Sequence, residues 1–162
     1  MAAVGAADPP RFLEGEVTAH ARRVAIVAAR FNDFIVKSLI EGAVGAWREA
    51  GGDPRELLVA RVPGAFEIPV VVRKLAASTR YDALVALGCV IRGDTPHFDY
   101  VAGECARGLQ LASLETGVPV AFGVLTVNTL EQALERAATT GANKGAEAMR
   151  TALEMAGLLG RL

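Results

Sequence analysis

The segment Ala86–Val101 carries the residue types in this chain that are best suited to catalysis. It reads ALGCVIRGDTPHFDYV, so an apolar run stops at the polar stretch Arg92–His97 and a helical pattern follows. In parallel α/β sheets, ligands bind at such turns, which follow the carboxyl ends of strands. His97 is one of two histidines in the chain, and an imidazole can donate or accept a proton near neutral pH. His97 is therefore a candidate acid or base, although a lone histidine in such a loop often has no catalytic role.

The same loop also holds groups that could bind an anion. Thr95 and the backbone amides around Gly93 lie beside a predicted helix start, where phosphate binds readily. The chain has neither G-x-x-x-x-G-K-[ST] nor G-x-G-x-x-G, so the usual nucleotide fingerprints are absent. Arg136 and Lys144 could bind an anion as well, but most helical arginines and lysines are simply solvated. We expect no metal site, because no pair of His, Cys or Asp has ligand spacing.

The elements that must position these residues follow from hydrophobic periodicity. Short apolar runs alternate with helical patterns, which predicts a three-layer α/β/α sandwich around a four-stranded parallel sheet. The predicted strands are Val24–Ala28, Glu56–Val62, Ala83–Val90 and Val120–Thr126. The predicted helices run from Phe34 to the stop at Gly51, over Ile68–Ala77, from His97 with Phe98 and Val101 on its inner face, from Thr129 to about Ala138, and over Lys144–Leu159. We expect residues 1–16 to form a flexible arm and residues 17–162 to form a single domain.

Composition limits the functional classes. Hydrophobic residues make up 52% of the 162 residues and the mean hydropathy is +0.32, yet no apolar run approaches the roughly 18 residues that span a membrane. We therefore expect self-association to bury the surplus. A net charge of −1 without a basic run argues against nucleic acid as a partner. Two cysteines without C-x-x-C spacing favour a reduced, cytoplasmic protein, and the N-terminus lacks a signal-peptide pattern.

Five motifs occur in an order and spacing that resemble the lumazine synthase family. They are RFN at Arg30–Asn32, VPGAFEIP at Val62–Pro69, the Ala86–Val101 segment, GVLTVNTLEQALERA at Gly123–Ala137 and NKGAEA at Asn143–Ala148. The resemblance extends from about Val24 to the C-terminus and implies a flavodoxin-like fold. It also implies an activity, the condensation of 5-amino-6-(D-ribitylamino)uracil with 3,4-dihydroxy-2-butanone 4-phosphate to 6,7-dimethyl-8-ribityllumazine. This reaction of riboflavin biosynthesis releases phosphate and water and needs no cofactor.

By this resemblance the two substrates have separate sets of ligands. The ribitylaminouracil would contact Phe31, Ala65, Phe66, Glu67, Cys89, Val90, Ile91 and Phe122, with Phe31 stacking on the ring and the Glu67 carboxylate accepting from ribityl hydroxyls. The butanone phosphate would contact Gly93, Asp94, Thr95 and Arg136, with Lys144 in support and His97 shuttling protons. Phe122, Arg136 and Lys144 would come from a neighbouring subunit. Because an acid would repel phosphate, we expect Asp94 to bind through its backbone N–H. The plainer alternatives make Phe31 and Phe66 core residues and Glu67 a helix-dipole partner.

The resemblance also implies a homo-oligomer built of pentamers. The short connection Ala138–Asn143 favours an icosahedral shell of twelve pentamers, with riboflavin synthase as a further partner. Glu16–Ala19 could add an edge strand to the neighbour's sheet. Two other functions remain open. A non-catalytic flavin or lumazine carrier, or a shell protein, could dispense with His97 and Arg136. A Schiff-base aldolase would need Lys144 in an apolar pocket, where the amine is neutral at pH 7.

Overall fold

Four parallel strands form one sheet, as the periodicity predicts. The computed structural model describes residues 8–162. The strands are β1 (Val24–Ala29), β2 (Leu58–Val62), β3 (Ala83–Ile91) and β4 (Val120–Val127), and their order in the sheet is β2-β1-β3-β4. Every neighbouring pair is parallel. This is the order of a flavodoxin-like sheet, in which the chain reverses its direction of winding between β1 and β3.

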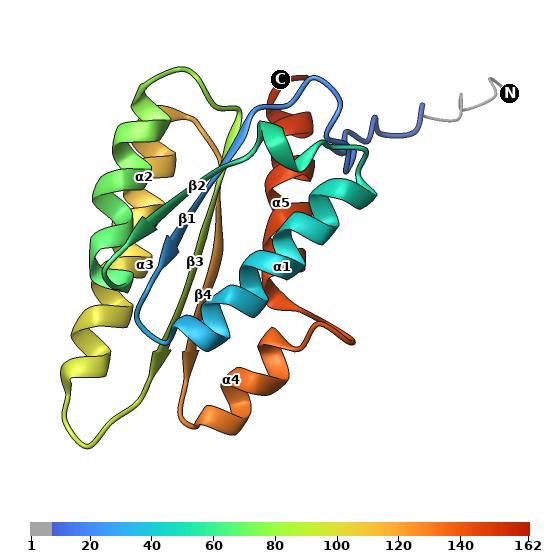
Figure 1. Ribbon diagram of the computed structural model, residues 1–162. Helices are drawn as coiled ribbons and strands as arrows, with labels where there is room; N and C mark the ends of the chain where they lie inside the picture. Colours follow the sequence, from blue (N-terminus) through green and yellow to red (C-terminus); the bar gives the residue numbers. More distant parts are fainter. Residues whose placement is uncertain (1–7) are drawn as a thin grey trace, which may run out of the picture.

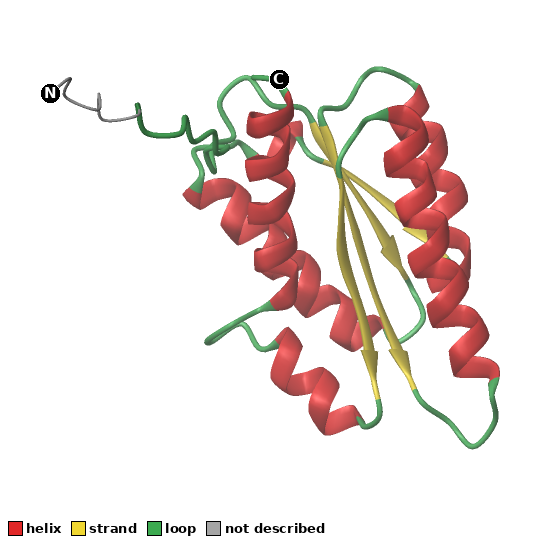
Figure 2. Cartoon of the chain, turned by 180° about the vertical axis from the view of Figure 1, so that it is seen from behind, coloured by secondary structure: helices red, strands yellow, loops and turns green. Residues whose placement is uncertain are grey.

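Helices cover both faces of the sheet, which confirms the three-layer sandwich (Figures 1 and 2). The helices α1 (Asp33–Glu49), α4 (Leu130–Ala137) and α5 (Lys144–Leu159) lie on one face, and α2 (Ile68–Ala77) and α3 (His97–Thr116) lie on the other. None of the helices within residues 8–162 is both long and apolar enough to cross a membrane.

Two hydrophobic cores result from this arrangement, and β1 contributes to both. All six of its residues are buried, and successive side chains point to opposite faces. Val24, Ile26 and Ala28 pack towards α1 and α5, whereas Ala25, Val27 and Ala29 pack towards α2 and α3. A strand buried on both faces reads as a continuous apolar run, which is why no polar residue interrupts it.

The predicted start of the second strand at Glu56 is wrong. Residues Pro54–Glu56 form a short 3-10 helix instead, and β2 begins at Leu58. Asp53 caps this turn, since its carboxylate accepts a hydrogen bond of 2.9 Å from the backbone N–H of Arg55. A proline in the first turn supports the same conformation. The predicted cap at Thr129 is confirmed, because its hydroxyl accepts from the N–H of Gln132 at 3.2 Å.

The expected N-terminal arm of residues 1–16 lies in part outside the described residues, which begin at residue 8. Residues 8–19 contain neither helix nor strand, but the end of this segment is packed on α5. Gly15 lies against the backbone of Glu154 with no room for a side chain, and Arg161 donates a hydrogen bond of 2.7 Å to the carbonyl of Glu14.

Candidate active site

A cavity lies at the edge of the sheet where the strands end. It has a volume of about 670 Å³, and its lining comes from the loops after β1, β2 and β3, from the last residues of β3 and from the first turn of α3. The lining residues are Phe31, Pro63, Gly64, Ala65, Phe66, Glu67, Cys89, Val90, Ile91, Gly93, Thr95, His97, Phe98, Tyr100 and Val101. We call this the strand-end cavity. It lies beside β1 and β3, between which the winding reverses, and this is where open parallel sheets bind ligands.

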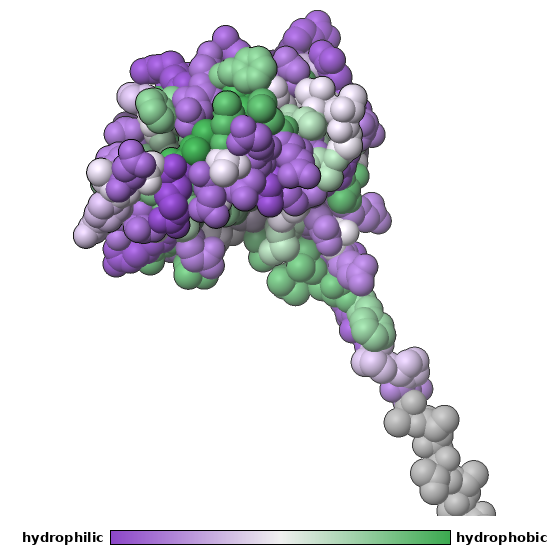
Figure 3. All heavy atoms as spheres, turned by 90° about the horizontal axis from the view of Figure 1, so that it is seen from below, coloured by the Kyte–Doolittle hydropathy of each residue, from purple (hydrophilic) through white to green (hydrophobic). Residues whose placement is uncertain are grey.

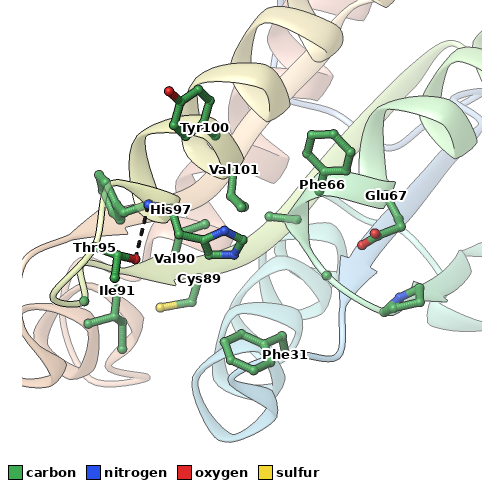
Figure 4. Close-up of a pocket in the computed structure, with 15 residues that line it drawn as sticks. Phe31, Phe66, Glu67, Cys89, Val90, Ile91, Thr95, His97, Tyr100 and Val101 are labelled. Carbon is green, nitrogen blue, oxygen red and sulfur yellow. Dashed lines mark hydrogen bonds between the residues drawn. The ribbon is translucent and has the colours of Figure 1, made fainter.

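The aromatic residues of this cavity are not part of the core. Phe31 and Phe66 are 71% and 58% exposed, which excludes the plainer reading of both as core residues. His97 projects from the start of α3 into the space faced by Phe31 and by the segment that carries Phe66 and Glu67 (Figure 4). Seen from this edge, hydrophobic surface gathers near the middle of the molecule with hydrophilic residues around it (Figure 3). An apolar depression with few polar groups is typical of a small-molecule site.

Hydrogen bonds between the strand-end loops hold Phe31 in place. Its backbone N–H donates to the carbonyl of Pro63 at 3.0 Å. The next residue, Asn32, has a left-handed backbone with φ of 60° and caps α1. Its side-chain amide donates a 2.8 Å hydrogen bond to the carbonyl of Cys89 at the end of β3. The first loop is therefore joined directly to the end of β3, which forms the floor of the cavity.

Arg92 fixes the loop that leads to His97, because it contacts the end of β4 on one side and the first turn of α3 on the other. Its backbone N–H donates to the carbonyl of Val127 at 2.8 Å, and its Nε donates to the Asn128 side chain at 3.1 Å. Its guanidinium lies over the Phe98 ring, 4.3 Å from the ring centre. Within this loop Gly93 and Thr95 line the cavity, whereas Asp94 is exposed and is not among the lining residues. The side chain of Asp94 therefore contributes nothing to the cavity wall.

The two cysteines are the weakly reactive thiols that the sequence indicates. Cys89 lies in the floor of the cavity and is 3% exposed, and Cys105 is buried in α3. Burial raises the pKa of each thiol to about 11. Both are therefore protonated at neutral pH, and a protonated thiol is a poor nucleophile.

Phe122, Arg136 and Lys144 line a second cavity of about 440 Å³, formed by β4, α4 and α5. We call it the edge cavity, because β4 is an outer strand of the sheet. It shares no lining residue with the strand-end cavity. Nη1 of Arg136 donates to the carbonyl of Gln132 at 3.1 Å. Lys144 pairs with Glu147 at 2.8 Å and its side chain is 43% exposed. A paired, half-exposed ammonium group argues against the Schiff-base alternative, which needs a desolvated lysine.

Sequence reasoning did not assign Pro63, Gly64, Phe98, Tyr100 and Val101 to the site. The predicted apolar face of α3 is confirmed at Val101, which is partly buried against the core that contains Cys105 and also lines the cavity. Phe98 is partly buried as well and lines the cavity. Helical spacing could have identified two of them, since Tyr100 and Val101 lie three and four residues after His97 and share its face.

The described part of the chain, residues 8–162, contains no group of three His, Cys, Asp or Glu side chains placed to hold a metal ion. Residues 21–160 match the model of one protein family, described as 6,7-dimethyl-8-ribityllumazine synthase. The match includes every residue that lines either of the two cavities.

Proposed function

Because the chain belongs to the 6,7-dimethyl-8-ribityllumazine synthase family, we propose that it condenses 5-amino-6-(D-ribitylamino)uracil with 3,4-dihydroxy-2-butanone 4-phosphate in riboflavin biosynthesis. The observation that carries this proposal is the division of polar groups between the two cavities. His97, Glu67 and the exposed ring of Phe31 gather in an apolar strand-end cavity, and Arg136 and Lys144 lie in the edge cavity.

The strand-end cavity suits the ribitylaminouracil. Phe31 offers an exposed ring on which a pyrimidine can stack. Backbone groups of Ala65 and Phe66 and the carboxylate of Glu67 supply acceptors for ribityl hydroxyls, while Cys89, Val90 and Ile91 form the floor. The phosphate of the second substrate would bind at the backbone amides of Gly93, Asp94 and Thr95, just before the N-terminus of α3, where a helix favours negative charge.

We propose that the edge cavity of one subunit completes the strand-end cavity of the next. Phe122, Arg136 and Lys144 would then reach the substrates from the neighbouring subunit. A planar guanidinium can engage phosphate through two hydrogen bonds, and this assigns the phosphate to Arg136. In a single chain its Nη1 donates to a carbonyl of its own helix.

The reaction consists of proton transfers and eliminations. The primary amine of the uracil attacks the ketone to give a carbinolamine and then an imine. Phosphate leaves, and the ribitylamino nitrogen closes the second ring with loss of water. His97, on the wall of the strand-end cavity, is placed to donate and accept these protons. Holding both substrates in reactive geometry supplies much of the remaining acceleration.

The family implies oligomerisation, and several large apolar side chains support it. Val70 on α2 and Leu114 on α3 are 69% and 70% exposed in the single chain, which is unusual unless a partner covers them. We propose cytoplasmic pentamers, assembled into an icosahedral shell that could accommodate riboflavin synthase. The edge strand proposed for Glu16–Ala19 would join a neighbour's sheet in this assembly.

A direct assay tests the function. The purified oligomer is mixed with both substrates, and lumazine formation is followed by absorbance for the wild type, Arg136→Ala and His97→Ala. Arg150→Ala is the matched control, because Arg150 is an exposed arginine of α5 that pairs with Glu49 and lines neither cavity. Product formation that Arg136→Ala reduces strongly and Arg150→Ala leaves unchanged supports the synthase. Tight binding of lumazine or riboflavin without turnover would instead support the carrier.

A further inference from the structure

Asn143 is the only residue with a polar side chain that is buried within residues 8–162, at 4% exposure. Burying an amide is costly unless its hydrogen-bonding groups are satisfied. Here each group has a partner. Oδ1 accepts from the N–H of Ala146 at 3.0 Å, and Nδ2 donates to the carbonyls of Ala137 at 2.9 Å and Ser38 at 3.1 Å. One side chain therefore joins the start of α5, the end of α4 and the middle of α1.

Two glycines make space for this arrangement. A side chain at Gly42 of α1 would overlap the Asn143 amide, and one at Gly145 would overlap the backbone of Leu39 in the same helix. The first turn of α5 is thus in backbone contact with α1. The close approach leaves the amide little freedom to adopt another position, because interiors are packed without spare volume.

The cap of α5 by itself does not require an asparagine. Serine, threonine or aspartate can accept the same hydrogen bond at a helix N-terminus. What asparagine adds is the donation to Ala137, whose carbonyl belongs to the last turn of α4 and would otherwise lack an intrahelical partner. This link spans the connection between α4 and α5, where residues 139–142 are exposed.

The two linked positions are the immediate neighbours of the cationic residues of the edge cavity. Ala137 follows Arg136, and Asn143 precedes Lys144. We propose that Asn143 is a positioning residue that sets the distance between Arg136 and Lys144 and so shapes the edge cavity for a phosphate group. This inference rests on the proposed function for the identity of the phosphate. Phe122 lies on β4, outside the link, and its position is independent of Asn143.

The test compares Asn143→Ser and Asn143→Asp with the wild-type oligomer. Both variants keep an acceptor for the Ala146 N–H and lose the two donations of the amide, to Ala137 and to Ser38. We expect the KM for the butanone phosphate to rise about tenfold or more, since small misplacements at a reacting group have large effects, while the KM for the uracil stays within about twofold. Gly42→Ala should displace the Asn143 amide while Asn143 itself stays in the chain. It should therefore also raise the KM for the butanone phosphate more than the KM for the uracil.

Leu153→Ala is the control for lost stability, because Leu153 is fully buried in α5 and lines neither cavity. Leu153→Ala should lower the melting temperature without raising the KM for the butanone phosphate relative to the KM for the uracil. If both KM values rise together in the Asn143 variants, or if Leu153→Ala reproduces the difference, Asn143 is only structural and the inference is wrong.

Binding of inorganic phosphate, titrated by phosphorus NMR, separates this inference from the proposed function. If the wild type forms no lumazine but binds phosphate, the function fails, and weaker phosphate binding by Asn143→Ser still supports the positioning role. Undiminished phosphate binding in that variant contradicts it. If the wild type binds no phosphate, there is no anion site for Asn143 to shape, and the inference is overturned.

Discussion

The side-chain amide of Asn32 donates a 2.8 Å hydrogen bond to the backbone carbonyl of Cys89, 57 residues later in the chain. This bond joins the loop after β1, which carries Phe31, to the end of β3, which forms the floor of the cavity. The left-handed backbone of Asn32, with φ of 60°, aims the amide across the gap. A short polar side chain tolerates this conformation better than most residues do.

Two substitutions at Asn32 separate the hydrogen bond from the backbone conformation. Asn32→Gly keeps the left-handed conformation and loses the bond, and it should lower the free energy of unfolding by about 1 kcal/mol. Asn32→Ala loses both and should cost about 1 kcal/mol more. Denaturant unfolding at a fixed protein concentration measures the two values. If the two variants lose the same free energy of unfolding, the left-handed conformation is no less favourable for alanine than for glycine at this position, which contradicts the prediction.

Replacing His97 should slow the proposed reaction without abolishing it. General acid–base catalysis by one side chain contributes about a hundredfold at the lower end of its usual range, and the rest comes from holding the substrates together. We expect His97→Ala to reduce kcat by about that factor with little change in either KM. Arg136→Ala should have the larger effect on kcat/KM, because phosphate binding and departure both depend on it. A loss of many powers of ten in His97→Ala would contradict this division.

Mixing His97→Ala with Arg136→Ala, two variants of reduced activity, tests whether adjacent subunits share a site. His97 and Arg136 lie in different cavities, so a ring assembled from both variants contains some sites in which each half is intact. After denaturation and co-refolding in equal amounts, about a quarter of the sites should be complete in a head-to-tail ring. Activity should then rise well above that of either variant alone. No recovery in mixed rings of confirmed composition would place both residues in the site of a single subunit.

Cys89 and Cys105 form a matched pair for probing the strand-end cavity. Burial raises the pKa of both thiols to about 11, so alkylation by iodoacetamide should be slow at pH 7 and about tenfold faster for each pH unit up to pH 10. Only Cys89 lines the cavity. Lumazine or a substrate analogue should therefore protect Cys89 and leave Cys105 unaffected, as mass spectrometry of the labelled peptides would show. Equal protection of both would indicate global stabilisation instead of occupancy of the cavity.

The pairing of Asp82 with Arg23 predicts a loss of stability in acid. Burial raises the pKa of Asp82, but hydrogen bonds and charge from Arg23 outweigh burial and lower it below 3.8. Because the folded pKa lies below the unfolded one, the contribution is present above about pH 4 and disappears as the pH falls through the folded value. Asp82→Asn should cost about 1 kcal/mol at pH 7, allowing for the exposed partner, and much less near pH 2. Denaturant unfolding at pH 7 and at pH 2 measures this, and an equal difference in the free energy of unfolding between the wild type and Asp82→Asn at both pH values would contradict the prediction. Asp82 immediately precedes β3, at the edge of the sheet opposite the strand-end cavity, and it lines neither cavity. Activity should therefore not change.

Much of the strand-end cavity follows from the sequence, because its determinants are local. An apolar run such as Ala83–Val90 followed by the polar stretch Arg92–His97 predicts a buried strand and a loop at its carboxyl end. Parallel strands bring such loops to one edge, which is why Phe31, Glu67 and His97 could be expected to meet. The start of β2 was misplaced because the competing signal, an Asp53 cap on a proline turn, acts over three residues and outweighs strand propensity.

The sequence by itself determined the alternation of strands and helices and the loop that carries His97, since both depend on patterns within one segment. Helical spacing places Tyr100 and Val101 on the same face as His97, but only the tertiary structure showed that this face forms a wall of the cavity. Only the tertiary structure showed that Asn143 joins the end of α4 to the start of α5, beside Arg136 and Lys144. Those relations depend on how α1, α4 and α5 pack, and contacts between distant segments leave no periodic signal in the chain.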